Sequence, residues 1–268
     1  MKRVIIFSFF VLIISSQSFA QGISKLFLRA QYSVTAIEYI GNKQYNDWMY
    51  LDLGKNESIY YSFFNHARDS IVQSQLSLGY SAYEIMENTR NMQRGRKDIF
   101  HISSESKTIK HYSVITAEHY FKSEPTEQIN WTILKDTLTI LSYKCIKATA
   151  RFKGREWTAW FTQDIPITAG PWKLRGLPGL ILKAYDAYNH YTFECMAIGG
   201  IDRNLDMKAF AKFREISAKE FDMLVYKFKT DALTMLENKG IKITGAKDAS
   251  GNTIDLKQRK SQYNPLEL

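Results

Sequence analysis

The sequence predicts an α+β protein in which a large, curved antiparallel β-sheet packs against a long C-terminal helix. Three observations lead to this prediction. Many short segments alternate apolar and polar residues, as half-buried strands do. Phe, Trp and Tyr make up 14% of the chain, and aromatic side chains favour pleated sheets. One late segment, residues 218–238, instead repeats apolar residues at helical spacing.

The first 20 residues have the three parts of a cleavable secretory signal peptide. They begin with the basic Met1-Lys2-Arg3, continue with an apolar run over residues 4–14 and end in small residues up to Ala20. A membrane span needs roughly 20 consecutive apolar residues, so this run is too short to serve as an anchor. We therefore expect cleavage before Gln21 and an exported protein that is periplasmic, outer-membrane-associated or secreted, and not integral to a membrane.

The composition is that of a folded domain with a basic surface. Apolar residues make up 45% of the chain and only five residues are proline, which argues against disorder. The formal net charge is +9, and the basic residues are scattered, as on a soluble surface. After export, acidic polysaccharides or lipid headgroups are more suitable partners than nucleic acid. The densest basic clusters are residues 94–97, 153–155 and 259–260.

We expect residues 21–245 to form a single β-rich domain. Alternation over residues 31–38, 47–53 and 58–64 predicts an opening three-strand meander, and a helical insertion follows over residues 66–93. Further strands are predicted over residues 99–103, 108–116, 119–123, 129–134, 138–153, 155–162, 179–185 and 191–197.

The final helix has a defined start and end. Ser217-Ala-Lys-Glu220 is a capping box, in which the serine side chain accepts from the third backbone N–H and the glutamate reaches back. The apolar stripe then continues to about Asn238, and Gly240 stops the helix. Residues 246–268 are expected to form a polar tail.

Two cysteines, Cys145 and Cys195, leave two alternatives open. An oxidising compartment favours a disulfide between them, provided that their Cα atoms come within about 7 Å. Otherwise both are buried free thiols that pack as small apolar side chains.

The most distinctive segment, residues 164–183, is rich in turn chemistry. In Leu177-Pro178-Gly179-Leu180, proline pre-sets one φ and glycine supplies a positive one, which is typical of a type II turn. Gly170-Pro171 predicts a second bend, and Gly176 would let the backbone pass close to a neighbour. Leu180-Ile181-Leu182 then begins a buried strand.

The hexapeptide from Gly176 to Ile181 resembles the motif that names the GLPGLI family of secreted bacterial proteins. Flanking elements over residues 143–148, 154–160, 164–166 and 170–171 also look like the family pattern, in the same order. The resemblance covers about residues 131–186 and implies export in Gram-negative-type cells. It implies no established activity and no catalytic residue.

This segment has two interpretations. It is either a rigid loop that presents side chains to a ligand or partner, or turn chemistry that locks the edge of a sheet; the backbone roles of Gly and Pro favour the second. On the first interpretation, the candidate binding residues are Arg155, Trp160, Asp164, Trp172, Lys173 and Arg175.

No familiar catalytic or metal-binding motif is present. The five histidines form no His-Glu-x-x-His motif, and there is no nucleophile elbow or phosphate-binding loop. His111 and His119 could face each other across a hairpin and, with Glu118, hold a metal, but a structural role is commoner, so no metal or cofactor is predicted.

Our leading hypothesis is therefore a non-enzymatic envelope module that binds an apolar ligand such as a lipid in a curved sheet. The comparison with bacterial lipoprotein carriers is an analogy of fold only. A second hypothesis is a protein partner beside an outer-membrane transporter, docked on an exposed patch with Trp172 and Arg175. A third is a hydrolase of envelope polymers that uses Asp164 and another carboxylate.

Overall fold

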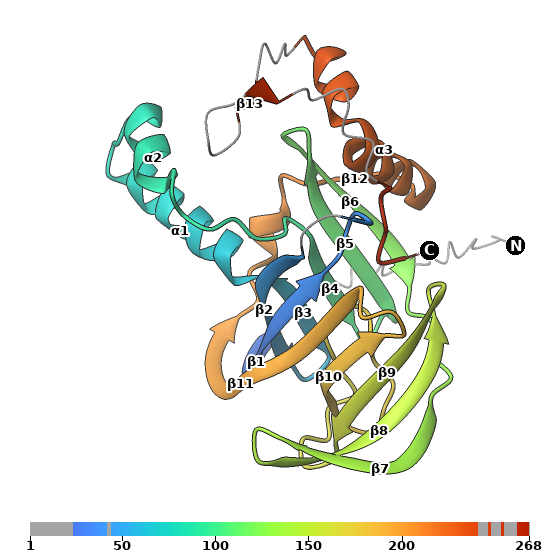
Figure 1. The fold of residues 1–268 in the computed structure, drawn as a ribbon. Helices are drawn as coiled ribbons and strands as arrows, with labels where there is room; N and C mark the ends of the chain where they lie inside the picture. The colour runs from blue at the N-terminus through green and yellow to red at the C-terminus, as the bar shows by residue number, and fades with distance from the viewer. Residues whose placement is uncertain (1–23, 42–43, 241–245, 248–252, 255–261, 268) are drawn as a thin grey trace, which may run out of the picture.

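The chain folds around one 12-stranded β-sheet (Figure 1). The computed structural model describes residues 24–41, 44–240, 246–247, 253–254 and 262–267. The signal peptide expected at residues 1–20 lies outside the described residues. The sheet is curved, and its edge strands do not pair with each other, so it is open rather than closed.

The strand order is simple, because most neighbours in the sheet are also neighbours in the chain. One half runs in the order β12-β6-β5-β4-β3-β2-β1 and the other in the order β11-β10-β9-β8-β7. The strands of the first half are β1 (Lys25–Ala36), β2 (Tyr45–Gly54), β3 (Glu57–Ser62), β4 (Ile99–Ser103), β5 (Thr108–Ile115), β6 (Glu118–Pro125) and β12 (Arg214–Glu215). Those of the second half are β7 (Thr132–Ile140), β8 (Tyr143–Phe152), β9 (Arg155–Thr162), β10 (Leu180–Asp186) and β11 (Tyr191–Asn204).

The two halves join where β1 pairs with β11 in antiparallel register, from Lys25 opposite Asn204 to Ala36 opposite Tyr191. All other pairs in this sheet are antiparallel except the short β12–β6 pair, which is parallel. Separately, β13 (Ala246–Lys247) pairs with β14 (Thr253–Ile254). Adjacent hairpins therefore build the sheet from local connections.

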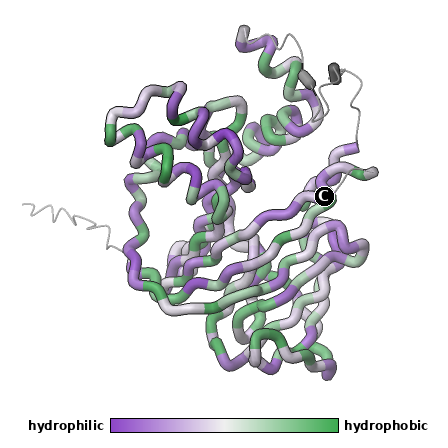
Figure 2. The backbone as a smooth tube through the Cα atoms, turned by 60° about the vertical axis from the view of Figure 1, so that its left-hand side comes forward, coloured by the Kyte–Doolittle hydropathy of each residue, from purple (hydrophilic) through white to green (hydrophobic). Residues whose placement is uncertain are grey.

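Alternation along the strands places the main hydrophobic core on one side of the sheet, here called the inner face. In β1, Tyr32, Val34 and Ala36 are all buried, as their shared face predicts. Figure 2 shows hydrophobic and hydrophilic residues alternating along the strands. Phe161 of β9 and Phe193 of β11 join the same core from the other half of the sheet.

Helices α1 (Phe63–Ser77) and α2 (Ala82–Thr89) lie between β3 and β4. They fall in the helical insertion expected over residues 66–93, except that α1 begins at Phe63, at the end of the segment expected to be a strand. A short 3-10 helix, η1 (Met207–Phe210), precedes β12. Among the residues that are described, no helix combines the length and the apolar character that crossing a membrane requires.

The last helix, α3 (Ala218–Glu237), begins at the predicted cap, where the Ser217 side chain accepts from the backbone N–H of Glu220. The prediction of one long helix is not confirmed. Asp231 has a φ of −149° and a ψ of 53°, so two helical pieces meet at a kink. Only Phe221 of α3 is fully buried, where the helix meets β5 and β6. The other residues of the helix are half-buried or exposed.

The loop between β9 and β10 carries the hexapeptide and folds back into the core. Trp172, Leu174 and Leu177 are buried there, and the ring of Trp172 lies 5.8 Å from that of Trp157. The turn is tighter than the type II turn expected, because the N–H of Gly179 donates to the carbonyl of Leu177. This loop is part of the packed interior.

Two of its glycines have different roles. Gly179 has a φ of +153°, and a Cβ there would lie 1.9 Å from the carbonyl oxygen of Thr162. Gly176 also has a positive φ, +92°, but a Cβ there would meet nothing closer than 3.9 Å. The close backbone approach expected at Gly176 therefore occurs at Gly179, while Gly176 is favoured by its φ alone.

Both cysteines are free and buried, so the disulfide alternative is not what the structure shows. Cys145 lies on β8 and Cys195 on β11, with β9 and β10 between these strands in the sheet. Burial raises the pKa of the Cys145 thiol to about 11 and that of Cys195 to about 12. Both thiols are therefore protonated at neutral pH.

Candidate functional site

A cavity of about 520 Å³ lies over the inner face of the sheet. Its floor comes from β1 to β5 and β11, with Tyr60 and Phe193 among the residues that line it. Trp172 of the β9–β10 loop and Phe221 of α3 contribute aromatic walls. Charged side chains from five separate parts of the chain also line it, which distinguishes it from an ordinary core void.

A histidine–carboxylate pair lies on the wall of this cavity. Nε2 of His111, on β5, lies 2.9 Å from Oδ1 of Asp98, the residue before β4. The imidazole packs between the rings of Phe100 and Phe221, at centroid distances of 4.2 and 4.7 Å. Its other nitrogen, Nδ1, is buried and has no hydrogen-bond partner among the described residues.

Asp98 is held in its ionised form. Burial acts to raise the pKa of its carboxyl, but the hydrogen bond and charge of His111, together with Lys229 and Arg96, hold this pKa well below its ordinary value. Asp98 and Nε2 of His111 share a proton donated by the ring, so the remaining site for proton exchange on the imidazole is Nδ1. The arrangement is that of a base and the group that orients it.

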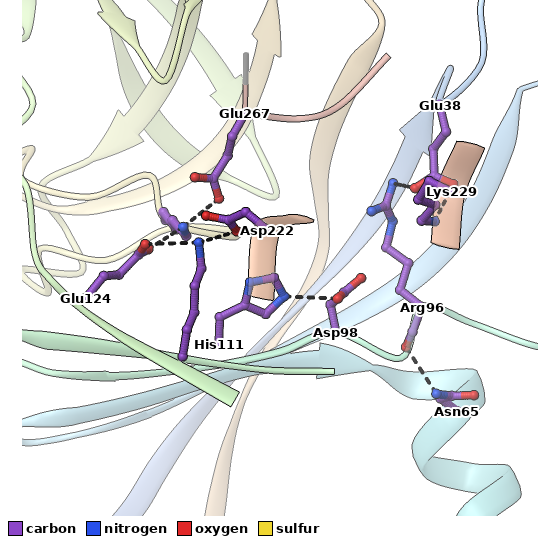
Figure 3. Close-up of polar contacts among 11 residues, drawn as sticks. Glu38, Asn65, Arg96, Asp98, His111, Glu124, Asp222, Lys229 and Glu267 are labelled. Atoms are coloured by element: carbon purple, nitrogen blue, oxygen red, sulfur yellow. Dashed lines mark hydrogen bonds and ion pairs between the residues drawn. The ribbon is translucent and has the colours of Figure 1, made fainter. Parts of the chain in front are cut away.

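A second polar group, around Arg96, lies beside this pair (Figure 3). Nη2 of Arg96 lies 2.7 Å from Oε1 of Glu38, and Nζ of Lys229 lies 3.1 Å from the other oxygen of that carboxylate. The backbone anchors Arg96 as well, since its N–H donates to the buried Asp47 and its carbonyl accepts from Asn65.

On the other side of His111, three lysines meet several carboxylates. We call Lys122, Lys153 and Lys173 the lysine cluster. The side chains of Lys173 and Lys122 are only 0% and 3% exposed. Glu124 of β6 contacts both of them, and Figure 3 shows Glu124, Asp222 and Glu267 converging here.

These charges shift one another's ionisation. Burial acts to raise the pKa of Glu124, but Lys173 and Lys122 lower it overall. Burial acts to lower the pKa of Lys122, but the hydrogen bond to Asp222 and the charge of Glu124 raise it. Each buried charge in the cluster therefore depends on an opposite charge beside it.

The chain's own C-terminal segment, residues 262–267, lies in the cavity. Asn264 bridges the two halves of the sheet: its N–H donates to Glu38, its side-chain nitrogen donates to Ile37, and its carbonyl accepts from the hydroxyl of Tyr191 at 2.6 Å. Glu267 then reaches Lys173, with 2.5 Å between Oε1 and Nζ. The segment expected to be a polar tail thus contributes part of the site.

The candidate binding residues named from the sequence do not form one surface. Arg155 is buried and pairs with Asp186, its Nη1 lying 2.8 Å from Oδ2, and it also donates to Asn264 of the C-terminal segment. Trp160 is half-buried outside the cavity, where Nζ of Lys147 lies 5.8 Å from its ring centroid. Asp164 is exposed and does not meet Arg155.

The remaining three candidates divide between the two faces of one loop. Trp172 and Lys173 are buried, each 1% exposed, and Trp172 lines the cavity, so the exposed docking patch expected at Trp172 does not exist. Arg175 lies instead at a second hollow of about 340 Å³, on the far side of the loop, beside Ser104. Trp172 and Arg175 therefore do not form the shared exposed surface on which the hypothesis of a protein partner depended.

Most residues of the site have little signal in the sequence. Glu38, Asp98, Glu124 and Glu267 stand in no motif, although the basic clusters at residues 94–97 and 153–155 contain Arg96, Lys153 and Arg155. The sequence predicts His111 as a structural strand residue or a metal ligand, and contains no signal for its pairing with Asp98. The β5–β6 hairpin places His111 opposite Lys122 and His119 opposite Val114, so the two histidines point to different faces.

No group of three or more potential metal ligands occurs among the residues with described positions.

Two solved structures of PNGF-II, in different crystal forms, resemble the fold. They match with TM-scores of 0.52 and 0.51 and identities of 16% and 15%, covering 75% of this chain and 33% of theirs. The chain thus spans about a third of the length of these structures, and the likeness concerns the fold.

A LolA superfamily protein from Nitrosomonas europaea matches with a TM-score of 0.28 and 9% identity, over 69% of this chain and 89% of that one. A score this low does not support the analogy with lipoprotein carriers. No curated protein matches the chain. The family match covers more than half of the chain, since residues 63–228 fit the family described as N-glycanase peptide, N-terminal domain.

This match corrects two predictions from the sequence. The assignment to the GLPGLI family is wrong. That assignment rested on the turn-forming residues of a short motif, whereas the family match covers residues 63–228. The hypothesis of a non-enzymatic binding module is also wrong, and the comparisons agree better with the hydrolase alternative. The chain belongs to the family described as N-glycanase peptide, N-terminal domain.

Proposed function

We propose that this chain acts in the hydrolysis of N-linked glycans and that the cavity receives the glycan-bearing substrate. The family match supports the reaction class. The cavity supports the ligand class, because sugars offer apolar C–H faces and many hydroxyls. The rings of Trp172, Tyr191 and Phe193 could pack against the C–H faces of a sugar. The polar groups of Glu38, Asp222 and Lys229 could bond to its hydroxyls.

The observation that carries the proposal is the His111–Asp98 pair. The bond that joins a glycan to an asparagine side chain is an amide, and its hydrolysis needs a base for the attacking water and an acid for the leaving nitrogen. Asp98 orients His111, Nδ1 takes the proton from water, and the imidazolium then donates it to the departing nitrogen. The proton that Nδ1 takes from water leaves with the departing nitrogen, so His111 returns to its starting state.

Access to His111 requires a movement of α3. Nδ1 is buried, and Phe221 of α3 packs against the imidazole ring. The kink at Asp231 and the small number of buried residues in α3 leave this helix weakly attached. In the proposal, the substrate displaces Phe221 and takes its place beside the ring.

The test compares glycan release by matched histidine variants. Purified chain is incubated with an N-glycosylated protein, and released glycans are measured by mass spectrometry. His111→Gln should lower the rate by about 10²-fold or more, and Asp98→Asn by a smaller factor, because general acid–base catalysis contributes on this order. The control is His190→Gln, since His190 stacks on Tyr188 and does not line the cavity.

Circular dichroism of each variant separates loss of chemistry from loss of fold. If folded His111→Gln released glycans at the wild-type rate, the assignment of His111 as the proton acceptor would be rejected. If the wild-type chain released none under any condition, the hydrolytic function itself would be rejected.

A further inference from the structure

The lysine cluster already holds one carboxylate that belongs to a different part of the chain. Glu267 lies 94 residues from Lys173 in the sequence, yet its Oε1 lies 2.5 Å from that ammonium group. Its second oxygen lies 3.9 Å from Nζ of Lys153. The carboxylate thus occupies a position between two of the three lysines.

Within the cluster, Lys173 depends most on the carboxylate at this position. Glu124 is the only other carboxylate in contact with Lys173 among the described residues, and it is shared with Lys122. Two further carboxylates pair with the other lysines of the cluster. Asp222, with a side chain that is 59% exposed, contacts Lys122, and Glu127, with a side chain that is 52% exposed, contacts Lys153. Without Glu267, the fully buried Lys173 would pair only with Glu124, which also pairs with Lys122. A buried charge that is incompletely paired is unfavourable.

The position borders the cavity. Lys153 and Glu267 both line the cavity, beside Trp172 and Phe221, whereas Lys173 is fully buried next to Glu267. Nζ of Lys173 lies 5.8 and 5.9 Å from the ring centroids of Phe100 and Trp172, which also face the cavity. A ligand carboxylate placed here would meet ammonium groups, while the rest of the ligand would lie against aromatic rings.

Side chains of the sheet hold the segment that carries Glu267 by hydrogen bonds to its backbone carbonyl groups. Arg155 donates to the carbonyl of Leu266 at 3.1 Å and also contacts that of Pro265, and the hydroxyl of Tyr191 donates to the carbonyl of Asn264. The backbone and side chain of Asn264 also bond to Glu38, Ile37 and Arg155, and a β-bridge joins Tyr39 to Tyr263. The anchor of the segment at Asn264 is therefore separate from the Glu267 carboxylate, whose contacts are with the lysines.

We propose that the lysine cluster is a binding subsite for the carboxylate of an acidic sugar and that Glu267 occupies it until such a ligand arrives. The inference rests on the proposed function, because that function supplies a glycan as the ligand. It adds that acidic glycans are preferred over neutral ones. The carboxylate of Glu267 and that of the ligand compete for Lys173 and Lys153.

Isothermal titration calorimetry of the full chain with 3′-sialyllactose and with lactose tests the subsite. The two probes share the same neutral disaccharide and differ by the acidic sugar. The wild-type chain should bind sialyllactose and bind lactose at least about tenfold more weakly. Glu267→Gln should bind sialyllactose about tenfold more tightly, because the competing charge is removed while the size of the side chain is kept.

Lys173→Met should lose the preference for sialyllactose, while the control Lys183→Met should behave as the wild type, since Lys183 pairs with Glu194 away from the cavity. If Lys173→Met does not fold, Glu267→Gln carries the test. A peptide of alternating glutamate and glycine distinguishes the source of the carboxylate: tighter binding of this peptide than of sialyllactose would overturn the assignment to a sugar.

Equal binding of lactose and sialyllactose, or no gain of affinity in Glu267→Gln, would overturn the subsite. These results are independent of catalysis. A chain that binds sialyllactose as expected but releases no glycan retains the subsite and loses the proposed function. A chain that releases neutral and acidic glycans equally, with no effect of Glu267→Gln, retains the function and loses the subsite.

Discussion

Nε2 of His111 and Oδ1 of Asp98 lie 2.9 Å apart at the wall of a cavity that the chain's own C-terminal segment partly fills. The contact joins the middle of β5 to the residue that leads into β4, and it leaves Nδ1 of His111 without a partner. The same pair therefore contributes to stability and offers a group that can transfer a proton.

The ionised Asp98 should make stability depend on pH in acid. Its pKa and that of Glu124 are lower in the folded protein than in the unfolded chain, so both stabilise the fold above the ordinary carboxyl pKa of about 4 and lose this effect as the pH falls below it. Urea unfolding between pH 7 and pH 3 should show the free energy of unfolding decreasing below about pH 4. In Asp98→Asn this decrease should be smaller by about 1 kcal/mol; an unchanged decrease would contradict the role of Asp98.

Gly179→Ala should destabilise the fold strongly. The new Cβ would lie 1.9 Å from the carbonyl oxygen of Thr162, and backbone on both sides would have to shift. We expect a loss of about 3 kcal/mol in the free energy of unfolding, measured by urea titration. Gly199→Ala is the matched control, because nothing lies within 4 Å of its added Cβ, and a comparable loss there would show that the clash is not the cause.

The two cysteines should resist labelling until the protein unfolds. Burial raises the pKa of Cys145 to about 11 and that of Cys195 to about 12, so very little thiolate exists near neutral pH. A thiol reagent added to unreduced protein should label neither residue in the native state and both in denaturant. Failure to label either residue in denaturant would indicate a disulfide.

The exported form should begin near Gln21. The basic start, short apolar run and small residues before this position predict a cleaved leader. N-terminal sequencing of protein recovered from the periplasm or medium is the measurement. Recovery of protein that retains Met1 from inside the cell would contradict export.

Local chemistry predicted much of the sheet and the start of the last helix. Tyr32, Val34 and Ala36 share a buried face because side chains of a strand alternate, and this needs no tertiary information. Ser217 caps α3 as its spacing from Glu220 predicts. The kink at Asp231 was not predictable, since the apolar stripe continues across it.

The site depends on contacts that no local pattern contains. Lys173 and Glu267 meet only because the curved sheet brings the β9–β10 loop and the C-terminal segment to the same cavity. The error about the family has a physical reason as well. Gly176 and Gly179 serve backbone conformation, and turn residues of this kind recur wherever a chain must bend.

The most direct measurement of the central claim is the mass of a defined N-glycopeptide after incubation with the purified wild-type chain. The proposed amide hydrolysis should release the whole glycan and convert the asparagine to aspartate, and both products should be absent with His111→Gln. A glycopeptide that stays intact, or an asparagine that still carries a sugar, would contradict the claim that His111 and Asp98 act on the bond between glycan and protein.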